Sequence, residues 1–311
     1  MVKNDAALPQ KGRKIHAAPD DKIFNFFVVL IVSILFISVL YPMLYILAAS
    51  FSSANAIYAG KVFIWPVDFG LEGYELVFRN PLVWTGYANT IKYTVIGTAI
   101  NVSMIMIAAY PLSRRDLPGR NWLMALFTFT MYFGGGMIPN YLLVRDLHML
   151  DTTWALVLPG ALSVYQMIVA RTFLQTNIPV ELLQAAQIDS CNDTKFFFLI
   201  VLPLSKAIIA VSALFMAVNH WNAYFNAMMY LNTRNKIPLQ LVLREILISS
   251  EYAASSADLS AMDPELAEAI QRVADVMKYA LIVVSFAPIM CFYPFAQKYF
   301  MKGVMIGAIK G

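Results

Sequence analysis

The sequence predicts an all-α integral membrane protein with six transmembrane helices and both termini in the cytoplasm. Of its 311 residues, 59% are hydrophobic and only 14% are charged, whereas an average soluble domain carries about 25% charged residues. Several stretches reach the roughly 20 apolar residues that a membrane helix needs. Lysine and arginine gather at alternate ends of these stretches, as is typical of cytoplasmic loops.

Six stretches are long and apolar enough to be transmembrane helices. The first, residues 23–48, carries no charged residue. Its apolar core of about 25 residues exceeds the roughly 7–15 residues of a cleavable signal peptide, so we expect it to be retained as a helix. Residues 1–22 then form a cytoplasmic segment, and residues 23–311 form one transmembrane domain. The expected spans are approximately residues 23–48, 88–112, 121–144, 152–175, 196–222 and 278–299.

Basic residues near the span ends set the orientation, because cytoplasmic loops carry an excess of lysine and arginine. With an even number of spans, three basic clusters fall on one side, which places both termini in the cytoplasm. The clusters are Lys3, Lys11, Arg13, Lys14 and Lys22; Arg114, Arg115 and Arg120; and Lys298, Lys302 and Lys310.

Proline and glycine interrupt the apolar stretches. Each proline in or beside a span predicts a kink or a helix end, which neighbouring helices and water make tolerable in a membrane. The cluster Gly134-Gly135-Gly136 lies inside the third stretch. It favours a local break or close helix packing over a phosphate cradle, which requires a helix start in water. The prolines are Pro42, Pro111, Pro139, Pro159, Pro203 and Pro288.

The sequence carries no recognisable catalytic or metal-binding pattern. It has no G-x-x-x-x-G-K-[ST], H-E-x-x-H or G-x-S-x-G motif. Its three histidines have no neighbours at metal-ligand spacing. Cys191 falls in a cytoplasmic turn and Cys291 inside a span, so we do not expect them to pair. The net charge of +4 is too small to indicate nucleic acid. We therefore expect no enzyme activity, cofactor or metal in this chain.

A short polar helix stands between the fourth and fifth spans, in the cytoplasmic loop of residues 179–195. Pro179 ends the preceding helix, and strong helix formers fill residues 181–188. Asn192 or Asp193 can cap the next helix. The polar helix could lie on lipid headgroups or bind a protein. Interfacial helices are usually basic, and Glu181 and Asp189 are its only charged residues, which favours a protein partner.

The sequence of this loop, "PVELLQAAQIDSCNDTKFFFLIVLP", resembles the EAA loop of the permease subunits of ABC importers. Two positions depart from the family pattern. Gln184 stands where the family usually has Glu, and Ser190 stands where it usually has Gly, so Ser190 lacks the freedom of glycine to take a positive φ. The matching positions are Pro179, Glu181, Leu182, Ala185, Ala186, Asp189, Ile200, Leu202 and Pro203.

The resemblance covers all but about the first 20 residues. The segments "FGGGMIPNYLLVRDLHMLDT", "HWNAYFNAMMYL" and "YPFAQKYFMKGVMIGAIKG" are similar to carbohydrate permeases, in particular the maltose-type second permease subunits of the lipo-oligosaccharide branch. It implies a type I importer fold in a bacterial plasma membrane and oligosaccharide as cargo. It also implies that the loop is a coupling helix docking on a separate ATPase. The residues implied in this coupling are Glu181, Gln184, Ala185, Ala186, Asp189, Ser190, Leu202 and Pro203.

The same resemblance implies a set of partners. They are a second, homologous permease, two copies of an ATPase that binds ATP and magnesium, and an extracellular solute-binding lipoprotein. The external segment 231–278 is the expected contact for the binding protein, because Asp263-Pro264-Glu265 reads as a capped helix start within it. We also expect the tail from Lys298 to Gly311 to contact the ATPase.

Two polar groups of residues in the spans are candidates for the sugar path, because polar groups in a membrane are costly and an aromatic ring beside hydrogen-bonding groups suits a sugar. The alternative is that these residues pair with neighbouring helices. The candidates are Tyr165, Gln166, Asn219, His220, Trp221 and Asn222. Two other functions remain open at this stage, an ion-gradient-driven transporter and a membrane scaffold. The near absence of charged residues in the spans counts against the first.

Overall fold

The computed structural model describes residues 19–255, 272, 274–291 and 294. Within these residues the chain is helical, and its only strand-like pairing is an isolated bridge between Ser52 and Phe69. The predicted binding-protein helix start at residues 263–265 and the tail at residues 298–311 lie outside the described residues.

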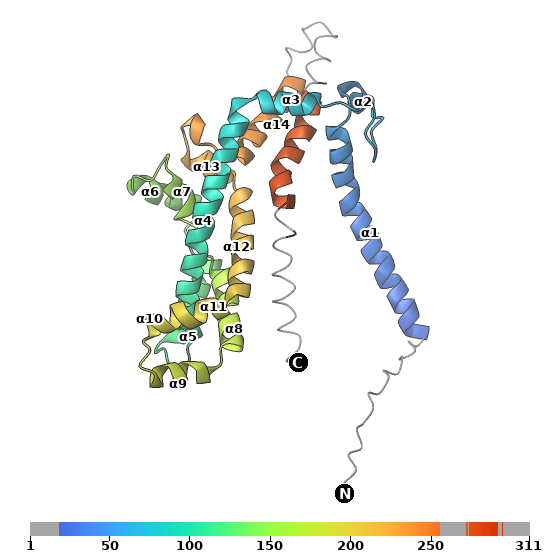
Figure 1. Ribbon diagram of the computed structural model, residues 1–311. Coiled ribbons are helices and arrows are strands. Elements are labelled where there is room, and N and C mark those ends of the chain that lie inside the picture. Colours follow the sequence, from blue (N-terminus) through green and yellow to red (C-terminus); the bar gives the residue numbers. More distant parts are fainter. Residues whose placement is uncertain (1–18, 256–271, 273, 292–293, 295–311) are drawn as a thin grey trace.

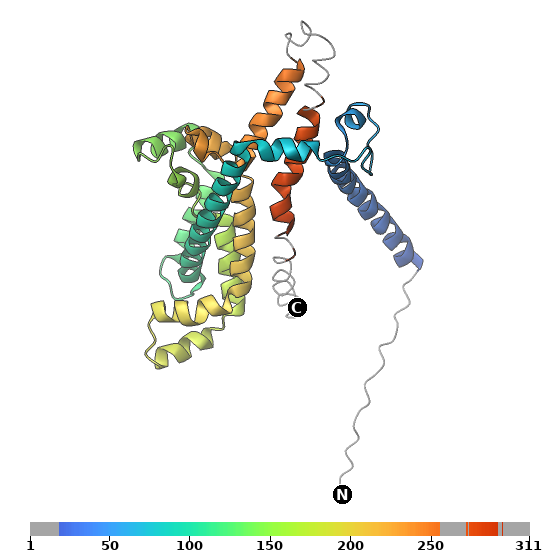
Figure 2. The same ribbon diagram turned by 45° about the horizontal axis from the view of Figure 1, so that its top comes forward.

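Helix α1 (Pro19–Ser50) stands apart from the other helices and joins them at its C-terminal end (Figures 1 and 2). The most apolar 18-residue window within Lys22–Ser50 has a mean hydropathy of 2.9, and none of that window is buried within the chain. Ala48 and Ala49, at the end of the helix, pack with Val276. The short helices α2 (Ala54–Tyr58) and α3 (Glu72–Arg79) follow it.

Helix α4 (Pro81–Ser113) is the central helix of the bundle. Asn80 caps its start by accepting a hydrogen bond from the Leu82 amide, and Pro81 occupies the first turn, where no backbone donor is needed. The helix therefore begins several residues before the span expected over residues 88–112. It packs against α8 (Val164–Asn177), α12 (Lys206–Trp221) and α14 (Leu239–Ser255) (Figure 1).

The apolar stretch expected over residues 121–144 is not one straight helix. Helices α5 (Arg120–Tyr132) and α6 (Met137–Asp146) meet at 108°. The glycines between them cause the break, because Gly136 adopts a φ of +88°, which other residues rarely tolerate. The break predicted at Gly134-Gly135-Gly136 is therefore confirmed, and close packing is not its role, since a Cβ on Gly134 or Gly136 would meet no atom within 4 Å.

The stretches expected over residues 152–175 and 196–222 are also interrupted. In the first, α7 (Thr153–Val157) and α8 are separated by residues 158–163, which include Pro159. In the second, α10 (Asp193–Phe196) continues as a π-helix (Phe197–Val201) and α11 (Leu202–Leu204), and then bends by 78° into α12. The remaining elements are α9 (Val180–Ile188), α13 (Phe225–Tyr230) and a 3-10 turn (Arg234–Lys236).

By length and composition, three helices among the described residues are able to cross a membrane: Lys22–Ser50, Pro81–Ser113 and Ala274–Cys291. Each of two bent pairs, α5 with α6 and α10–α11 with α12, adds one more if it counts as a single span, which makes five. The count of six spans and the cytoplasmic location of both termini therefore stay predictions.

Candidate functional site

The predicted coupling helix is α9, and it ends in a Schellman motif. The Cys191 amide donates to the Ala186 carbonyl (2.9 Å), and the Ser190 amide donates to the Gln187 carbonyl (3.1 Å). These two bonds satisfy carbonyls that a helix end would otherwise leave free. Asn192 then caps α10 by accepting from the Lys195 amide. The loop of residues 179–195 is therefore a defined turn between two helices, at the lower end of the bundle in Figure 1.

Ser190 occupies the position of this motif that requires a left-handed backbone, with a φ of +54°. The serine thus adopts the geometry that glycine would supply, and it does so at a conformational cost. Replacing the family's glycine with serine has kept the turn and strained it.

We expect Ser190→Gly to stabilise the loop by about 1 kcal/mol, because glycine adopts positive φ without a steric penalty. Slower hydrogen exchange of the Cys191 amide would show this. Asp189→Gly is the matched control, since Asp189 has a φ of −77° and glycine offers no relief there. Equal protection in Ser190→Gly and wild type would contradict the prediction.

The two alanines of the loop differ in burial, although they are adjacent on α9. Ala186 is only 7% exposed and packs in the core of this chain, together with Phe196 and Leu174. Ala185 is exposed. The small side chain of Ala186 thus serves packing inside the subunit, and the part of both alanines in coupling stays a prediction.

The outward face of α9 combines apolar and polar groups. Ile188 is 84% exposed, the largest exposed fraction of any large apolar side chain among the described residues. Glu181, Gln184, Asp189 and Ser190 are exposed beside Ala185. Leu202 and Pro203 lie on α11, beyond the π-helix, and their part in coupling stays a prediction.

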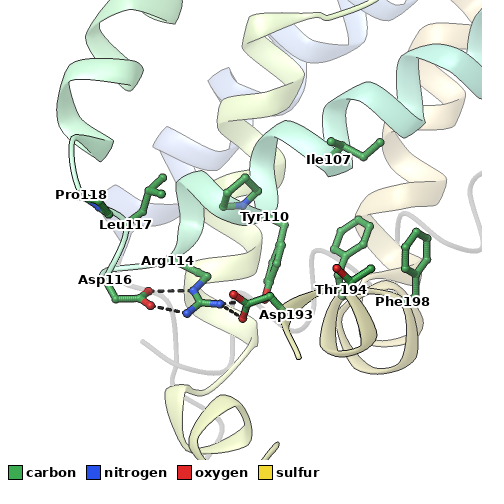
Figure 3. Close-up of a pocket in the computed structure, with 11 residues that line it drawn as sticks. Ile107, Tyr110, Arg114, Asp116, Leu117, Pro118, Asp193, Thr194 and Phe198 are labelled. Carbon is green, nitrogen blue, oxygen red and sulfur yellow. Dashed lines mark hydrogen bonds and ion pairs between the residues drawn. The ribbon is translucent and has the colours of Figure 1, made fainter. Parts of the chain in front are cut away.

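Arg114, which the sequence indicated only as a marker of orientation, ties the coupling loop to α4 (Figure 3). It follows the last residue of α4, and its side chain is 15% exposed. Its Nε donates to Asp116 Oδ1 (2.9 Å) and its Nη2 to Asp116 Oδ2. Its Nη1 donates to Asp193, the first residue of α10, and to the Tyr110 hydroxyl (3.4 Å). No local pattern could reveal the Arg114–Asp193 pair, because 79 positions separate its members.

The ion pairs keep these groups charged. The hydrogen bond from Arg114 holds the pKa of Asp116 below its usual range, and hydrogen bonds, first among them that of Asp116, raise the pKa of Arg114. A cavity of about 570 Å³ adjoins them, between the lower end of α4 and the start of the π-helix. Its lining includes Ile107, Tyr110, Phe197 and Phe198 (Figure 3).

His220 belongs to a buried network that joins three segments. Its Nε2 lies 2.6 Å from Asn101 Oδ1, and Asn101 Nδ2 donates to the carbonyls of Gly160 and Ala161, both at 2.7 Å. Because the Asn101 amide nitrogen serves both carbonyls, its oxygen accepts from a protonated His220 Nε2. Asn101 thus satisfies carbonyls that the break between α7 and α8 leaves free, which favours helix pairing over sugar contact for His220.

The other candidates for the sugar path fall into two groups, buried residues and exposed residues. Trp221 is buried, and its Nε1 donates to the Ser285 carbonyl (3.1 Å) in the helix Ala274–Cys291, which again indicates helix pairing. Gln166 is also buried. Tyr165, Asn219 and Asn222 are exposed on this chain. These three remain candidates for contact with cargo.

Asp151 organises the loop at the opposite end of the bundle from α9. Its carboxylate accepts from the Thr233 hydroxyl, from the amides of Asn232 and Thr233, and from Lys236 Nζ (2.6 Å). The hydrogen bond from Lys236 is the largest of the effects that hold the pKa of Asp151 well below its usual range. The loop before α7 is thereby fastened to the 3-10 turn before α14.

No protein-family model matches the chain, but individual proteins do. It is 42% identical over 272 residues to protein LplC of Bacillus subtilis, covering 87% of this chain and 89% of that protein. It is 42% identical over 270 residues to the polygalacturonan/rhamnogalacturonan transport system permease protein YtcP of the same organism, covering 87% and 92%. An arabinooligosaccharides transport system permease protein, AraQ of Halalkalibacterium halodurans, is 26% identical over 283 residues, covering 89% of this chain and 93% of that protein.

A solved structure shares the fold as well. A chain of a bacterial ABC transporter involved in the import of the acidic polysaccharide alginate superposes with a TM-score of 0.81 at 33% identity, covering 92% of this chain and 100% of that chain. These relatives are transport subunits and not enzymes, and they confirm the resemblance seen in the EAA loop. The chain belongs to the permease subunits of carbohydrate ABC importers, which are integral membrane proteins.

Proposed function

We propose that this subunit forms half of an oligosaccharide pathway across a bacterial plasma membrane, and that α9 couples the pathway to ATP hydrolysis on a separate protein. The exposed face of α9 carries the proposal. It presents Ile188, 84% exposed, beside Gln184 and Ala185, while Ala186 fixes the opposite face in the core of the chain. A large apolar side chain exposed on a rigid polar turn is suited to a pocket on a protein partner.

A permease of this family works with a second permease, an ATPase and a solute-binding protein. In finer detail, we propose a heterodimer with a homologous permease, two copies of the ATPase, which alone bind ATP and magnesium, and an extracellular binding lipoprotein. Six spans with both termini in the cytoplasm fit this arrangement, because they place α9 on the same side as Arg114, Arg115 and Arg120.

The cargo we propose is an oligosaccharide with acidic sugars. Two relatives support this choice, since one is named for polygalacturonan and rhamnogalacturonan and the other is described as importing alginate, an acidic polysaccharide. The exposed side chains of Tyr165, Asn219 and Asn222 have the chemistry to contact a sugar.

Substituting Ile188 tests the docking surface. In detergent extracts of native membranes, we expect an affinity-tagged wild-type complex to co-purify with its ATPase and Ile188→Asp to lose at least 90% of it, because a buried unpaired carboxylate is strongly unfavourable. Ile188→Leu is the matched control and should retain the ATPase. Thermal stability of the permease should stay unchanged, since Ile188 makes no core contact in this chain.

The buried alanine provides a second control. Ala186→Asp should lower the thermal stability of the permease itself, because Ala186 lies in its core. ATPase recovery with Ile188→Asp equal to that of wild type would overturn docking through this face. Absence of any ATPase from the wild-type preparation would overturn the proposed function.

A further inference from the structure

Both flanks of α9 are fastened to the last turn of one helix, α4. On the preceding side, Arg171 Nε of α8 donates to the Leu112 carbonyl (2.8 Å), and Gln175 Nε2 donates to the Ser113 carbonyl (3.2 Å). These are carbonyls that the end of α4 leaves without intrahelical partners. On the following side, Arg114 binds Asp193 at the start of α10. The coupling helix is thus held between two polar attachments to residues 112–114.

The attachment on the following side joins a largely shielded arginine to a carboxylate, Asp193, whose side chain is 64% exposed. A single exposed pair contributes about 0–1 kcal/mol. Arg114 is instead 15% exposed and binds Asp116 through two nitrogens, so its guanidinium is oriented before it meets Asp193. Tyr110 adds a hydrogen bond to Arg114 and a ring contact with Phe197, with centroids 5.2 Å apart. We call Tyr110, Arg114 and Asp193 the clasp.

The covalent route from α9 to α12 is the less rigid one. It passes through the π-helix Phe197–Val201 and then bends by 78° at Ser205. π-helical turns are rare and often occur at functional sites. The Ser205 hydroxyl is buried and has no hydrogen-bond partner among the described residues. A cavity of about 570 Å³ lies beside Phe197 and Phe198 of this route.

We infer that the clasp makes the coupling loop and α4 move as one body, so that Arg114 is a positioning residue for energy coupling. Movement of α9 then reaches the bundle through α4, the helix against which α8, α12 and α14 pack. The covalent connection from α9 to α12 adjusts to this movement by a change of angle at Ser205. This inference rests on the proposed docking of an ATPase at α9, and it adds the path by which the movement enters the membrane domain.

Asp193 offers a clean test, because Arg114 holds two carboxylates and only one belongs to the coupling loop. Spin labels would be placed at two exposed positions, Gln187→Cys on α9 and Met104→Cys on α4, with Cys191 and Cys291 replaced by serine. Pulsed electron paramagnetic resonance then gives the distribution of label distances in the full-length permease in lipid nanodiscs. We expect a narrow distribution in the wild-type background and a width at least twofold greater in Asp193→Asn.

Two variants separate the clasp from a general loss of stability. Asp116→Asn removes the carboxylate that orients Arg114 but keeps the bond to the coupling loop, so it should broaden the distribution less than Asp193→Asn does. Asp193→Glu should keep the narrow width of the wild type. The same distance can be measured in the complete importer. In the wild type, the distance between the two labels should stay the same when a non-hydrolysable ATP analogue and magnesium are added. In Asp193→Asn, that distance should change.

Two outcomes count against the inference. A width for Asp193→Asn equal to that of wild type would overturn it, and so would equal broadening by Asp116→Asn. If no ATPase accompanies the wild-type permease, the proposed function fails separately, and the width measured on the permease alone still decides whether the clasp holds the loop to α4.

Discussion

Replacing Gly97 by alanine is expected to be the most damaging single-methyl change in the bundle. A Cβ at Gly97 would lie 2.4 Å from His220 Nε2 and within 2.7 Å of two further ring atoms. The ring cannot turn aside without breaking its hydrogen bond to Asn101. Overpacking of a tight core costs about 1–3 kcal/mol, and we expect the upper end here because the neighbour is a pinned ring.

Thermal unfolding in detergent, followed by loss of the monodisperse gel-filtration peak, would measure this effect. At about 3 kcal/mol, the midpoint should fall by roughly 10 °C. Gly134→Ala is the matched control, since a Cβ there would meet no atom within 4 Å, and its midpoint should stay near that of wild type. Equal midpoints for Gly97→Ala and wild type would show that α4 and α12 do not approach each other as described.

Asn101→Leu should produce the second large loss. The change keeps the size of the side chain and removes the only donors to the Gly160 and Ala161 carbonyls that the described residues provide. It also leaves His220 Nε2 without its acceptor. Hydrogen bonds between membrane helices average about 0.6 kcal/mol and reach about 1.7 kcal/mol. Loss of all three hydrogen bonds, which leaves buried carbonyls unpaired, should lower the free energy of unfolding by about 3 kcal/mol.

Asn101→Leu should loosen the structure mainly at the break between α7 and α8. Hydrogen exchange should accelerate at the amides of residues 160–164, because Asn101 binds the Gly160 and Ala161 carbonyls and so fixes this segment. Ser103→Ala is the matched control, because the Ser103 hydroxyl donates only within its own helix, to the Ala99 carbonyl (2.8 Å). Unchanged exchange in Asn101→Leu would mean that the break does not depend on this side chain.

Apolar length predicted the presence of the long helices because burial in lipid depends mainly on composition. Helix α1 and the helix Ala274–Cys291 illustrate this. The break at Gly134-Gly135-Gly136 was also predictable, since local backbone freedom decides it. The bends inside the fourth and fifth stretches were foreshadowed by Pro159 and Pro203, but proline indicates a weak point and gives no angle.

Contacts between distant positions escaped prediction. His220 and Asn101 are 119 positions apart, and neither carries a local pattern that points to the other. The same holds for Arg114 and Asp193. Within α9, the motif identified the helix but not its inward face, because both alanines fit equally well until the core around Ala186 is known. Ser190 shows a further limit, since its positive φ is imposed by the turn against the preference of the residue.

The π-helix Phe197–Val201 also constrains how this sequence can change in length. A π-turn accommodates one residue more than the α-helical turn it replaces. Deleting the exposed Leu199 would restore α-helical winding and keep the flanking helices close to their present orientation. The same deletion in a regular α-helix would rotate everything on one side by about 100° relative to the other side. The π-helix is thus a place between α9 and α12 where one residue can be lost while the outward face of α9 keeps its direction.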